Sequence, residues 1–122
     1  MDFHSNQAIY IQIADLICEN ILTGKWQPEE RIPSVRELAV HTEVNPNTIM
    51  RTFTYLQEKN IIYNKRGIGY FVADDAWDTT RDLMKLKFMK NDLPYIYKTM
   101  KLLDITIKDL GDLFQQLGKE RS

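Results

Sequence analysis

The sequence predicts a mainly α-helical chain with a small β-hairpin, divided into an N-terminal domain at 1–75 and a C-terminal helical region at 76–122. Three observations predict this fold class. Apolar residues recur at helical spacing up to about residue 58. Two β-prone runs around a glycine-containing turn come next, and helical spacing returns from about residue 77. The expected architecture is an N-terminal winged helix-turn-helix followed by a two-helix dimerisation tail.

Length and composition bound the class of protein. A chain of 122 residues can bury one modest core but not two large domains. Hydrophobic residues make up 43% and charged residues 27%, which is an ordinary globular balance. No apolar run approaches the roughly 18 residues of a membrane span, and the amino end lacks the pattern of a signal peptide. We therefore expect a cytoplasmic protein with no membrane partner.

The first two helices have clear limits. One is predicted from Ala8 to Leu22, where apolar residues fall at helical steps, with Gly24 as its stop. After a turn-rich stretch, Ser34 and Glu37 match a capping box, in which each side chain satisfies a free amide of the first helical turn. The second helix is therefore short and ends by about Thr42.

A third helix starts at Asn45-Pro46, because asparagine is a good cap and proline suits the first helical position. Its apolar residues share one face, which consists of Ile49, Phe53 and Leu56. Its polar residues fall roughly opposite, and they are Asn47, Arg51, Thr54, Tyr55 and Glu58. Asn60 suits the left-handed position that ends the helix. The helix is therefore predicted to bury one face and expose the other.

A β-hairpin follows the third helix. Its strands are predicted at Ile61–Asn64 and Tyr70–Val72, with a basic tip at Lys65–Gly69. Two short helices joined by a tight turn, and then a hairpin, describe a helix-turn-helix unit with a wing.

The C-terminal region is predicted to form a helix from Trp77 to Met89, a break near Asn91-Asp92, and a longer helix to about Leu117. In the longer helix, apolar residues alternate steps of three and four, which is a seam that needs a partner helix. We expect this seam and the preceding helix to form a homodimer interface. Its residues are Leu83, Leu86, Leu93, Ile96, Met100, Leu103, Ile107, Leu110, Phe114 and Leu117.

Bulk charge does not point to a nucleic-acid partner. The formal net charge is −1, and residues 1–75 contain seven Lys and Arg against ten Asp and Glu. A binding argument must therefore rest on the positions of particular groups. Helix amino ends at Ser34 and Asn45 offer free amides and a positive dipole to phosphate. Arg36 and Arg51 offer forks that fit phosphates or guanine edges.

Several strings of residues resemble a known family over about residues 8–72. They are Ile9-Tyr10-Ile11-Gln12-Ile13, Ile32-Pro33-Ser34-Val35-Arg36-Glu37-Leu38-Ala39, Val44-Asn45-Pro46-Asn47-Thr48-Ile49 and Gly67-Ile68-Gly69-Tyr70-Phe71-Val72, with Gly24, Pro28 and Leu56. In these strings the chain resembles the GntR family of bacterial transcription regulators. The short helical tail is similar to that of the YtrA-like subgroup.

The resemblance implies a regulator, more often a repressor, that binds a palindromic double-stranded DNA operator as a homodimer. It also implies that the C-terminal region sometimes senses a small-molecule effector, whose identity the sequence does not give. Together with the residue arguments above, it predicts a DNA-binding set. This set is Ser34, Arg36, Asn45, Asn47, Thr48, Met50, Arg51, Lys65, Arg66 and Gly67.

Four positions depart from the family pattern. Glu29, Glu43 and Asn60 stand where glycine is frequent in the family, which we interpret as tolerable backbone substitutions. Met50 stands where many relatives carry a basic residue that touches DNA. This substitution suggests an apolar contact there, for instance to a thymine methyl.

Plainer interpretations of the same residues remain open. Arg36 could pair with Glu37 or Glu43, Arg51 with a helix carboxylate, and Lys65-Arg66 could serve only to keep a hairpin edge soluble. One set of apolar residues could line an effector pocket, although core or dimer packing explains it better. This set is Trp77, Met84, Phe88 and Met89.

No constellation of catalytic residues is apparent, and with a single cysteine, Cys18, no metal site or cofactor is expected. The alternative function from another class is a winged-helix protein-interaction module or helical scaffold without specific DNA binding. The acidic balance of residues 1–75 is the only feature that favours it.

Overall fold

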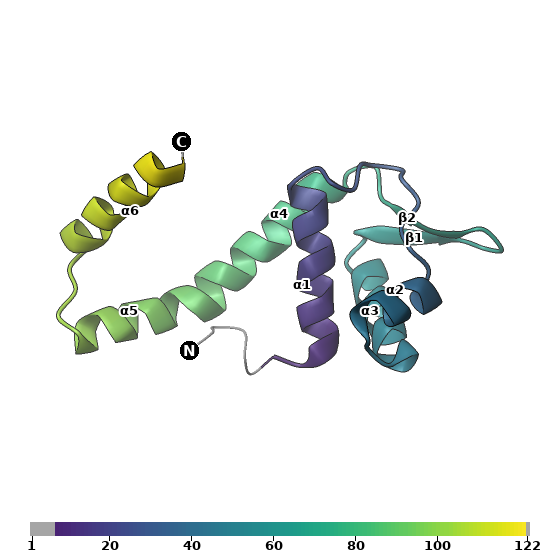
Figure 1. The fold of residues 1–122 in the computed structure, drawn as a ribbon, viewed down its shortest axis with the longest axis horizontal. Coiled ribbons are helices and arrows are strands. Elements are labelled where there is room, and N and C mark those ends of the chain that lie inside the picture. Colours follow the sequence, from purple (N-terminus) through teal and green to yellow (C-terminus); the bar gives the residue numbers. More distant parts are fainter. Residues whose placement is uncertain (1–6, 122) are drawn as a thin grey trace. The chain divides into compact units, whose positions relative to one another are not determined.

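The computed structural model describes residues 7–121, and these divide into two compact units. One unit extends through Met84 and the other begins at Lys85 (Figure 1). This division lies within a helix and about ten residues after the domain boundary predicted at Asp75. The predicted boundary concerns functional domains and stays a prediction. None of the described helices is both long and apolar enough to cross a membrane.

The N-terminal unit contains the predicted order of three helices and a hairpin. Its elements are α1 (Ile9–Leu22), α2 (Val35–Thr42), α3 (Pro46–Glu58), β1 (Ile62–Lys65), β2 (Gly69–Val72) and the start of α4 (Ala76–Lys87). Both α1 and α2 pack against α3, and α3 also contacts β1. The fold class predicted from the sequence, mainly helical with a small two-stranded sheet, is confirmed.

The core of this unit is built around α3. Ile49, Phe53 and Leu56 are fully buried, as the helical spacing predicts. The Phe53 ring packs edge-on against Tyr70 of β2, with 4.7 Å between ring centroids. Cys18 of α1 is also buried in this cluster. The buried face fixes α3, so that its opposite face turns outward.

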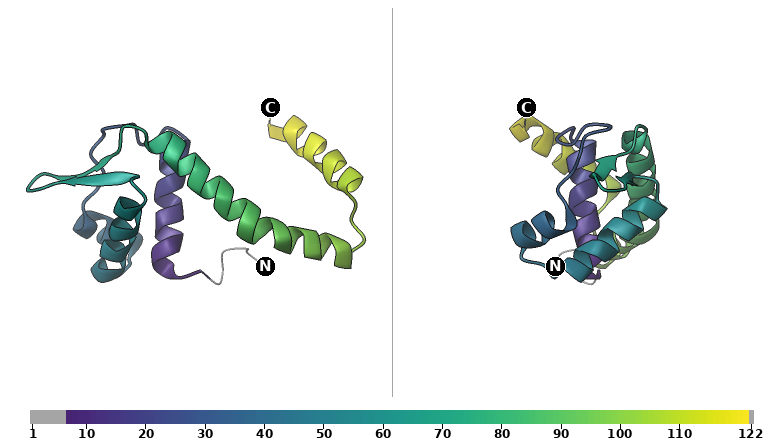
Figure 2. Two further views of the ribbon diagram at one scale, coloured as in Figure 1. Left: turned by 180° about the vertical axis from the view of Figure 1, so that it is seen from behind. Right: turned by 90° about the vertical axis from the view of Figure 1, so that its right-hand side faces the viewer.

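The hairpin is antiparallel, with Tyr63 opposite Phe71 and Lys65 opposite Gly69. The chain between α1 and α2 adds a third piece to this wing. Arg31 forms a bridge with Phe71, and the Ile32 N–H donates to the Tyr70 carbonyl at 2.9 Å. Figure 2 shows the hairpin extending away from the helices of this unit.

Two helix ends of the unit use left-handed residues that are not glycine. Glu43, after α2, has φ 57° and Asn60, after α3, has φ 62°. At each end, the next N–H reaches back to a carbonyl five residues earlier, from Val44 to Ala39 at 3.1 Å and from Ile61 to Leu56 at 3.0 Å. This is the hydrogen bond of the Schellman motif, which glycine favours. The left-handed position predicted for Asn60 is confirmed.

The break predicted near Asn91-Asp92 is wrong. The chain continues from α4 through one π-helical turn, η1 (Phe88–Asp92), into α5 (Leu93–Leu102). The Leu93 N–H donates to the Phe88 carbonyl, which is the wider spacing of a π turn. Pro94, at the start of α5, has no N–H to donate, and we attribute the wider turn to the room that its ring needs.

The prediction of one unbroken final helix that ends at about Leu117 is also wrong. The chain turns at residues 103–106, and α6 (Ile107–Arg121) follows. Asp104 takes the left-handed conformation, with φ 57°, and the Ile105 N–H donates to Met100 at 2.9 Å. Thr106 and Asp109 then form a reciprocal cap, with both hydrogen bonds between 3.0 and 3.1 Å. Leu103 therefore lies in a turn rather than on a helical seam.

Candidate nucleic-acid interface

The amino end of α2 is capped as predicted. The Ser34 Oγ accepts a hydrogen bond from the Glu37 N–H, and the Glu37 carboxylate accepts one from the Ser34 N–H, each at 3.1 Å. The hydrogen bond from the Ser34 backbone N–H, and after it the Ser34 hydroxyl, hold the pKa of the Glu37 carboxyl below its ordinary value, because both favour its charged form. Arg36 is exposed in this first turn. Within residues 7–121 it makes no ion pair with Glu37 or Glu43, so its guanidinium is available to a ligand.

The amino end of α3 is also capped, by a single side chain. The Asn45 Oδ1 accepts from the Asn47 N–H at 2.8 Å, and Pro46 occupies the first turn. The face opposite the buried residues is solvent-accessible. It presents Asn47, Thr48, Met50, Arg51 and Thr54, and the Met50 side chain is 41% exposed. This capped and exposed helix has the form of a recognition helix.

Among the residues that the structure describes, Arg51 pairs with no helix carboxylate, which was its alternative interpretation. Its guanidinium carbon lies 4.0 Å from the ring centroid of Tyr10, near the amino end of α1. Tyr10 is held in turn by an edge-on contact with Tyr55 and by Thr52, whose hydroxyl donates to the Tyr10 carbonyl at 2.7 Å. The contact restrains Arg51 on the exposed face of α3. Sequence reasoning missed this role of Tyr10, because nothing local connects residues 10 and 51.

The wing carries its basic residues on an exposed tip. Lys65, Arg66 and Gly67 are all exposed, and Gly67 has φ 79°, which favours glycine. The Lys65 ammonium lies 4.6 Å from the ring centroid of Phe71. The basic tip predicted from the sequence is thus exposed, and the contact with Phe71 restrains one of its two cations, Lys65.

A third cation, missed by sequence reasoning, joins the wing. The Arg31 side chain lies against Gly69, so closely that a Cβ added at Gly69 would be 2.9 Å from the Arg31 Nε. Gly69 has φ 147°, a backbone conformation that favours glycine, and the absence of a side chain there leaves room for Arg31. The only signal in the sequence is the Arg31-Ile32-Pro33 string, which is too short to indicate more than one or two strand residues and does not show that it pairs with the second strand.

The predicted site residues therefore lie on three exposed parts of the N-terminal unit: the start of α2, the open face of α3 and the wing tip. All three offer N–H groups or cations. In residues 7–121 no group of three His, Cys, Asp or Glu side chains is placed to hold a metal ion. The arrangement suits a polyanion that can touch several points at once.

The predicted dimerisation residues are largely solvent-exposed in the single chain. From Lys85 to Glu120 no described side chain is buried, and Ile107 and Phe114 of α6 are 78% and 63% exposed. An apolar groove of about 570 Å³ lies between α5 and α6, with Ile96 and Leu110 among its lining residues. Leu83 is an exception, because it packs against the core of the N-terminal unit.

The residues considered for an effector pocket fall into two pairs, one in the N-terminal unit and one in the C-terminal unit. The Trp77 indole N–H donates to the Leu22 carbonyl at 3.1 Å, and Met84 packs against the N-terminal core. Phe88 and Met89 are 45% and 53% exposed in the C-terminal unit. The first two are thus occupied in packing.

These features define a winged helix-turn-helix DNA-binding domain. The family model described as "Bacterial regulatory proteins, gntR family" matches residues 9–72, which is just over half of the chain. The protein is a member of the GntR family and a transcriptional regulator.

Two relatives match along most of the chain. The HTH-type transcriptional repressor YtrA of Bacillus subtilis is 28% identical over 120 residues, covering 98% of this chain and 92% of YtrA. A GntR-family putative transcriptional regulator from Bacteroides thetaiotaomicron, known as a crystal structure, is 43% identical with a TM-score of 0.75. The match covers 94% of this chain and all of that one. The resemblance to short, YtrA-type regulators is confirmed, and such relatives are regulators rather than enzymes.

A third relative was solved with DNA. The DNA-binding domain of AraR in complex with operator ORR3 is 33% identical with a TM-score of 0.51, over 52% of this chain and 77% of that one. The shared part has the length of one winged domain.

Proposed function

We propose that this regulator acts in the cytoplasm as a repressor that binds a palindromic DNA operator as a homodimer. The observation that carries the proposal is the common exposure of two capped helix ends and a basic wing on one small domain. The AraR domain, which binds an operator, and YtrA, which is a repressor, support it by similarity.

The residues divide into two roles. The amino ends at Ser34 and Asn45 present free N–H groups to phosphates, and Lys65, Arg66 and Gly67 bring the wing against the DNA backbone. The outer face of α3 enters the major groove and reads bases. Its reading residues are Asn47, Thr48, Met50 and Arg51, together with Arg36 from α2.

The assignment is tested with Arg36→Ala. Its side chain is exposed and makes no ion pair within residues 7–121, so the variant should fold normally. We expect specific affinity to fall by about 1–3 kcal/mol, or roughly fivefold to 150-fold. The measurement is a binding titration on an operator selected from random DNA.

Arg81→Ala is the matched control, because Arg81 is an exposed arginine on α4 that faces Asp78 and Asp82. It should bind like the parent chain. If the Arg36 variant binds the operator as tightly as the parent chain does, Arg36 is not part of the interface. A parent chain that selects no DNA sequence at all would instead favour the protein-interaction module.

The dimer follows from the apolar surface of α5 and α6. Side chains such as Ile107 and Phe114 are too exposed for a stable single chain, and hydrophobic burial against a second copy removes them from water. A two-fold dimer presents two recognition helices related by one axis. The operator should then be a palindrome with half-sites about one helical turn of DNA apart.

Ile107→Glu tests the interface by placing a charge on the exposed apolar surface of α6. We expect a monomer whose winged domain stays folded and whose affinity for the palindrome falls by at least about a hundredfold, since the second half-site no longer adds. Lys108→Glu is the control at the neighbouring position, where the native ammonium pairs with Asp112 at 3.4 Å in solvent. Sedimentation and DNA titration are measured together. A variant that stays dimeric, or a monomer of full affinity, would contradict the proposal.

A further inference from the structure

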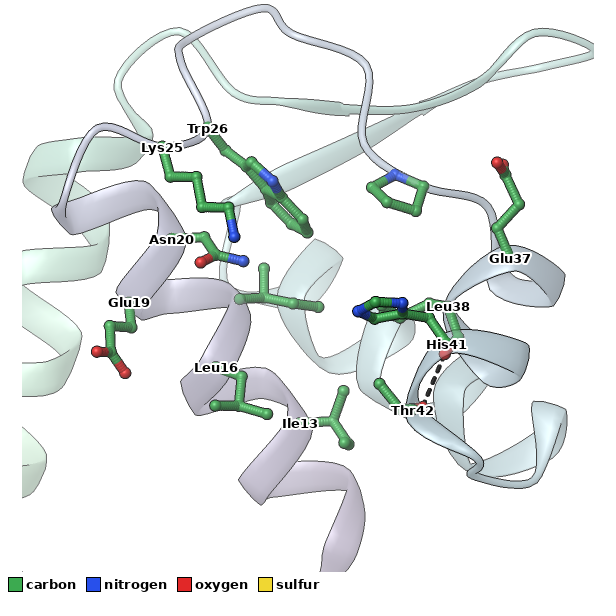
Figure 3. Close-up of a pocket in the computed structure, with 12 residues that line it drawn as sticks. Ile13, Leu16, Glu19, Asn20, Lys25, Trp26, Glu37, Leu38, His41 and Thr42 are labelled. Atoms are coloured by element: carbon green, nitrogen blue, oxygen red, sulfur yellow. Dashed lines mark hydrogen bonds between the residues drawn. The ribbon is translucent and has the colours of Figure 1, made fainter.

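A cleft in the N-terminal unit lies between α1 and α2, beneath the loop that joins them (Figure 3). Its volume is about 660 Å³, which falls in the usual range of small-molecule sites. The floor is apolar, with Ile13 and Ile17 of α1 and Leu38 of α2 all buried. The cleft is therefore a preformed hollow within one compact unit rather than a gap between mobile parts.

Hydrogen-bond donors line the cleft and come from three elements. They are Asn20 of α1, Lys25 and Trp26 of the loop, and His41 of α2. In Figure 3 the Lys25 ammonium, the Asn20 amide and the Trp26 ring are close to one another at one end. Within residues 7–121 the Trp26 indole N–H donates to no acceptor, whereas that of Trp77 donates to the Leu22 carbonyl. Among the described residues, the Trp26 indole N–H therefore has no acceptor and is available to a ligand.

The acidic residues at the cleft do not offset these donors. Figure 3 shows the Glu19 carboxylate turned away from the hollow and the Glu37 side chain at the amino end of α2, at the opposite end of the view from Lys25. The Glu37 carboxylate already accepts from the Ser34 N–H at 3.1 Å. What faces inward is an apolar floor with a cation and neutral donors at one end, which is complementary to a carboxylate attached to an apolar body.

We propose that this cleft is a binding site for a small organic carboxylic acid with an aromatic or aliphatic body. The carboxylate lies against Lys25 and the Trp26 indole N–H, and the body packs on the indole ring and on Leu38. The cleft borders α2, the helix that begins with Ser34 and Arg36. The site is independent of the DNA contacts proposed above, because its ligand and its test involve no DNA.

The test uses phenylacetate as the probe and phenylacetamide as its neutral counterpart, each titrated into the full-length chain labelled with nitrogen-15. The chain has two tryptophans, so its spectrum holds two indole N–H signals, which Trp26→Phe assigns. We expect phenylacetate to shift the Trp26 signal saturably and to leave the Trp77 signal in place. For a ligand of about ten non-hydrogen atoms, the dissociation constant should be on the order of 1 mM.

The charge is tested separately. Phenylacetamide should bind about tenfold more weakly, and Lys25→Met should weaken phenylacetate binding by a similar factor. Lys59→Met, at the end of α3, is the matched control and should not change it. Equal binding of acid and amide, an unaffected Lys25 variant, or a Trp26 signal that does not shift would each overturn the proposal.

Discussion

Replacing Glu43 by glycine should stabilise the protein. Glu43 is the residue after α2 and holds a left-handed conformation, with φ 57°. Its side chain is exposed, so the substitution removes no packing. It should also leave the backbone hydrogen bond from Val44 to Ala39 unchanged. The change therefore isolates the conformational preference of one residue.

The expected size follows from two opposing terms. A non-glycine residue in the left-handed region costs roughly 1–2 kcal/mol. Glycine costs about 0.5–1 kcal/mol because the unfolded chain gains freedom. The difference is a gain of about 0.5–1 kcal/mol in the free energy of unfolding. For a chain of this length, that gain raises Tm by about 2–4 °C.

The assay is thermal unfolding followed by far-ultraviolet circular dichroism, at one chain concentration because oligomers unfold in a concentration-dependent way. Glu19→Gly is the matched control, since Glu19 is exposed inside α1 in a right-handed helix. It should cost about 0.5–1 kcal/mol. If Glu43→Gly is neutral or destabilising while the control behaves as expected, the reasoning from backbone strain is refuted.

Three further outcomes are expected. Changing both Lys65 and Arg66 to alanine should lower affinity for all DNA sequences and reduce the salt slope by about two, read from titrations at several salt concentrations; a loss at one base position only would mean that the wing reads sequence. Tyr10→Leu should weaken operator binding about two- to fivefold by releasing Arg51, whereas Tyr10→Phe, which keeps the ring, should not. Because the folded-state pKa of Glu37 is lowered, the stability from its cap is present above its ordinary value of 4.5 and is lost as the pH falls through the lowered pKa. Unfolding measured over that range should show a smaller acid loss in Glu37→Gln.

What the sequence predicts well is what a few neighbouring residues decide. The cap of α2 needs only Ser34 and Glu37, and the cap of α3 needs only Asn45 and Pro46, so both are readable and both are confirmed. The left-handed residue Asn60 belongs to the same class. Each motif is complete within about one turn of helix, so no long-range contact is needed to form it.

The tail shows how a periodic pattern can mislead. The seam keeps its spacing from Met100 through Leu103 to Ile107, although residues 103–106 form a turn. Spacing records where apolar residues stand in the sequence, not whether the backbone between them is helical. The cap formed by Thr106 and Asp109 is a motif that the sequence contains, and it marks the start of a new helix. Such a motif is stronger evidence for a helix break than the apolar spacing is for one continuous helix.

The missed parts of the candidate site are pairs distant in sequence. Tyr10 meets Arg51, and Arg31 meets Phe71 and Gly69, only after α1, α3 and the hairpin have packed. No local propensity encodes such contacts. They nevertheless decide where two guanidinium groups are held, so the sequence predicts which residues carry charge better than it predicts which residues orient them.

The acidic balance of residues 1–75 does not argue against DNA binding, because charge acts over a limited distance. At physiological salt the screening length is about 8 Å. Glu58 stands at the carboxyl end of the 13-residue α3, and at about 1.5 Å per residue it lies roughly 20 Å from the cap at Asn45. Its repulsion is therefore largely screened at the phosphates that the cap would meet. Cations at the contact, such as Arg36 and Arg66, would lie within the screening length of the phosphates and are therefore screened much less. The net charge of the domain therefore says little about DNA affinity: cations at the contact provide the attraction to phosphates, and the base contacts of the recognition helix decide which sequence is preferred.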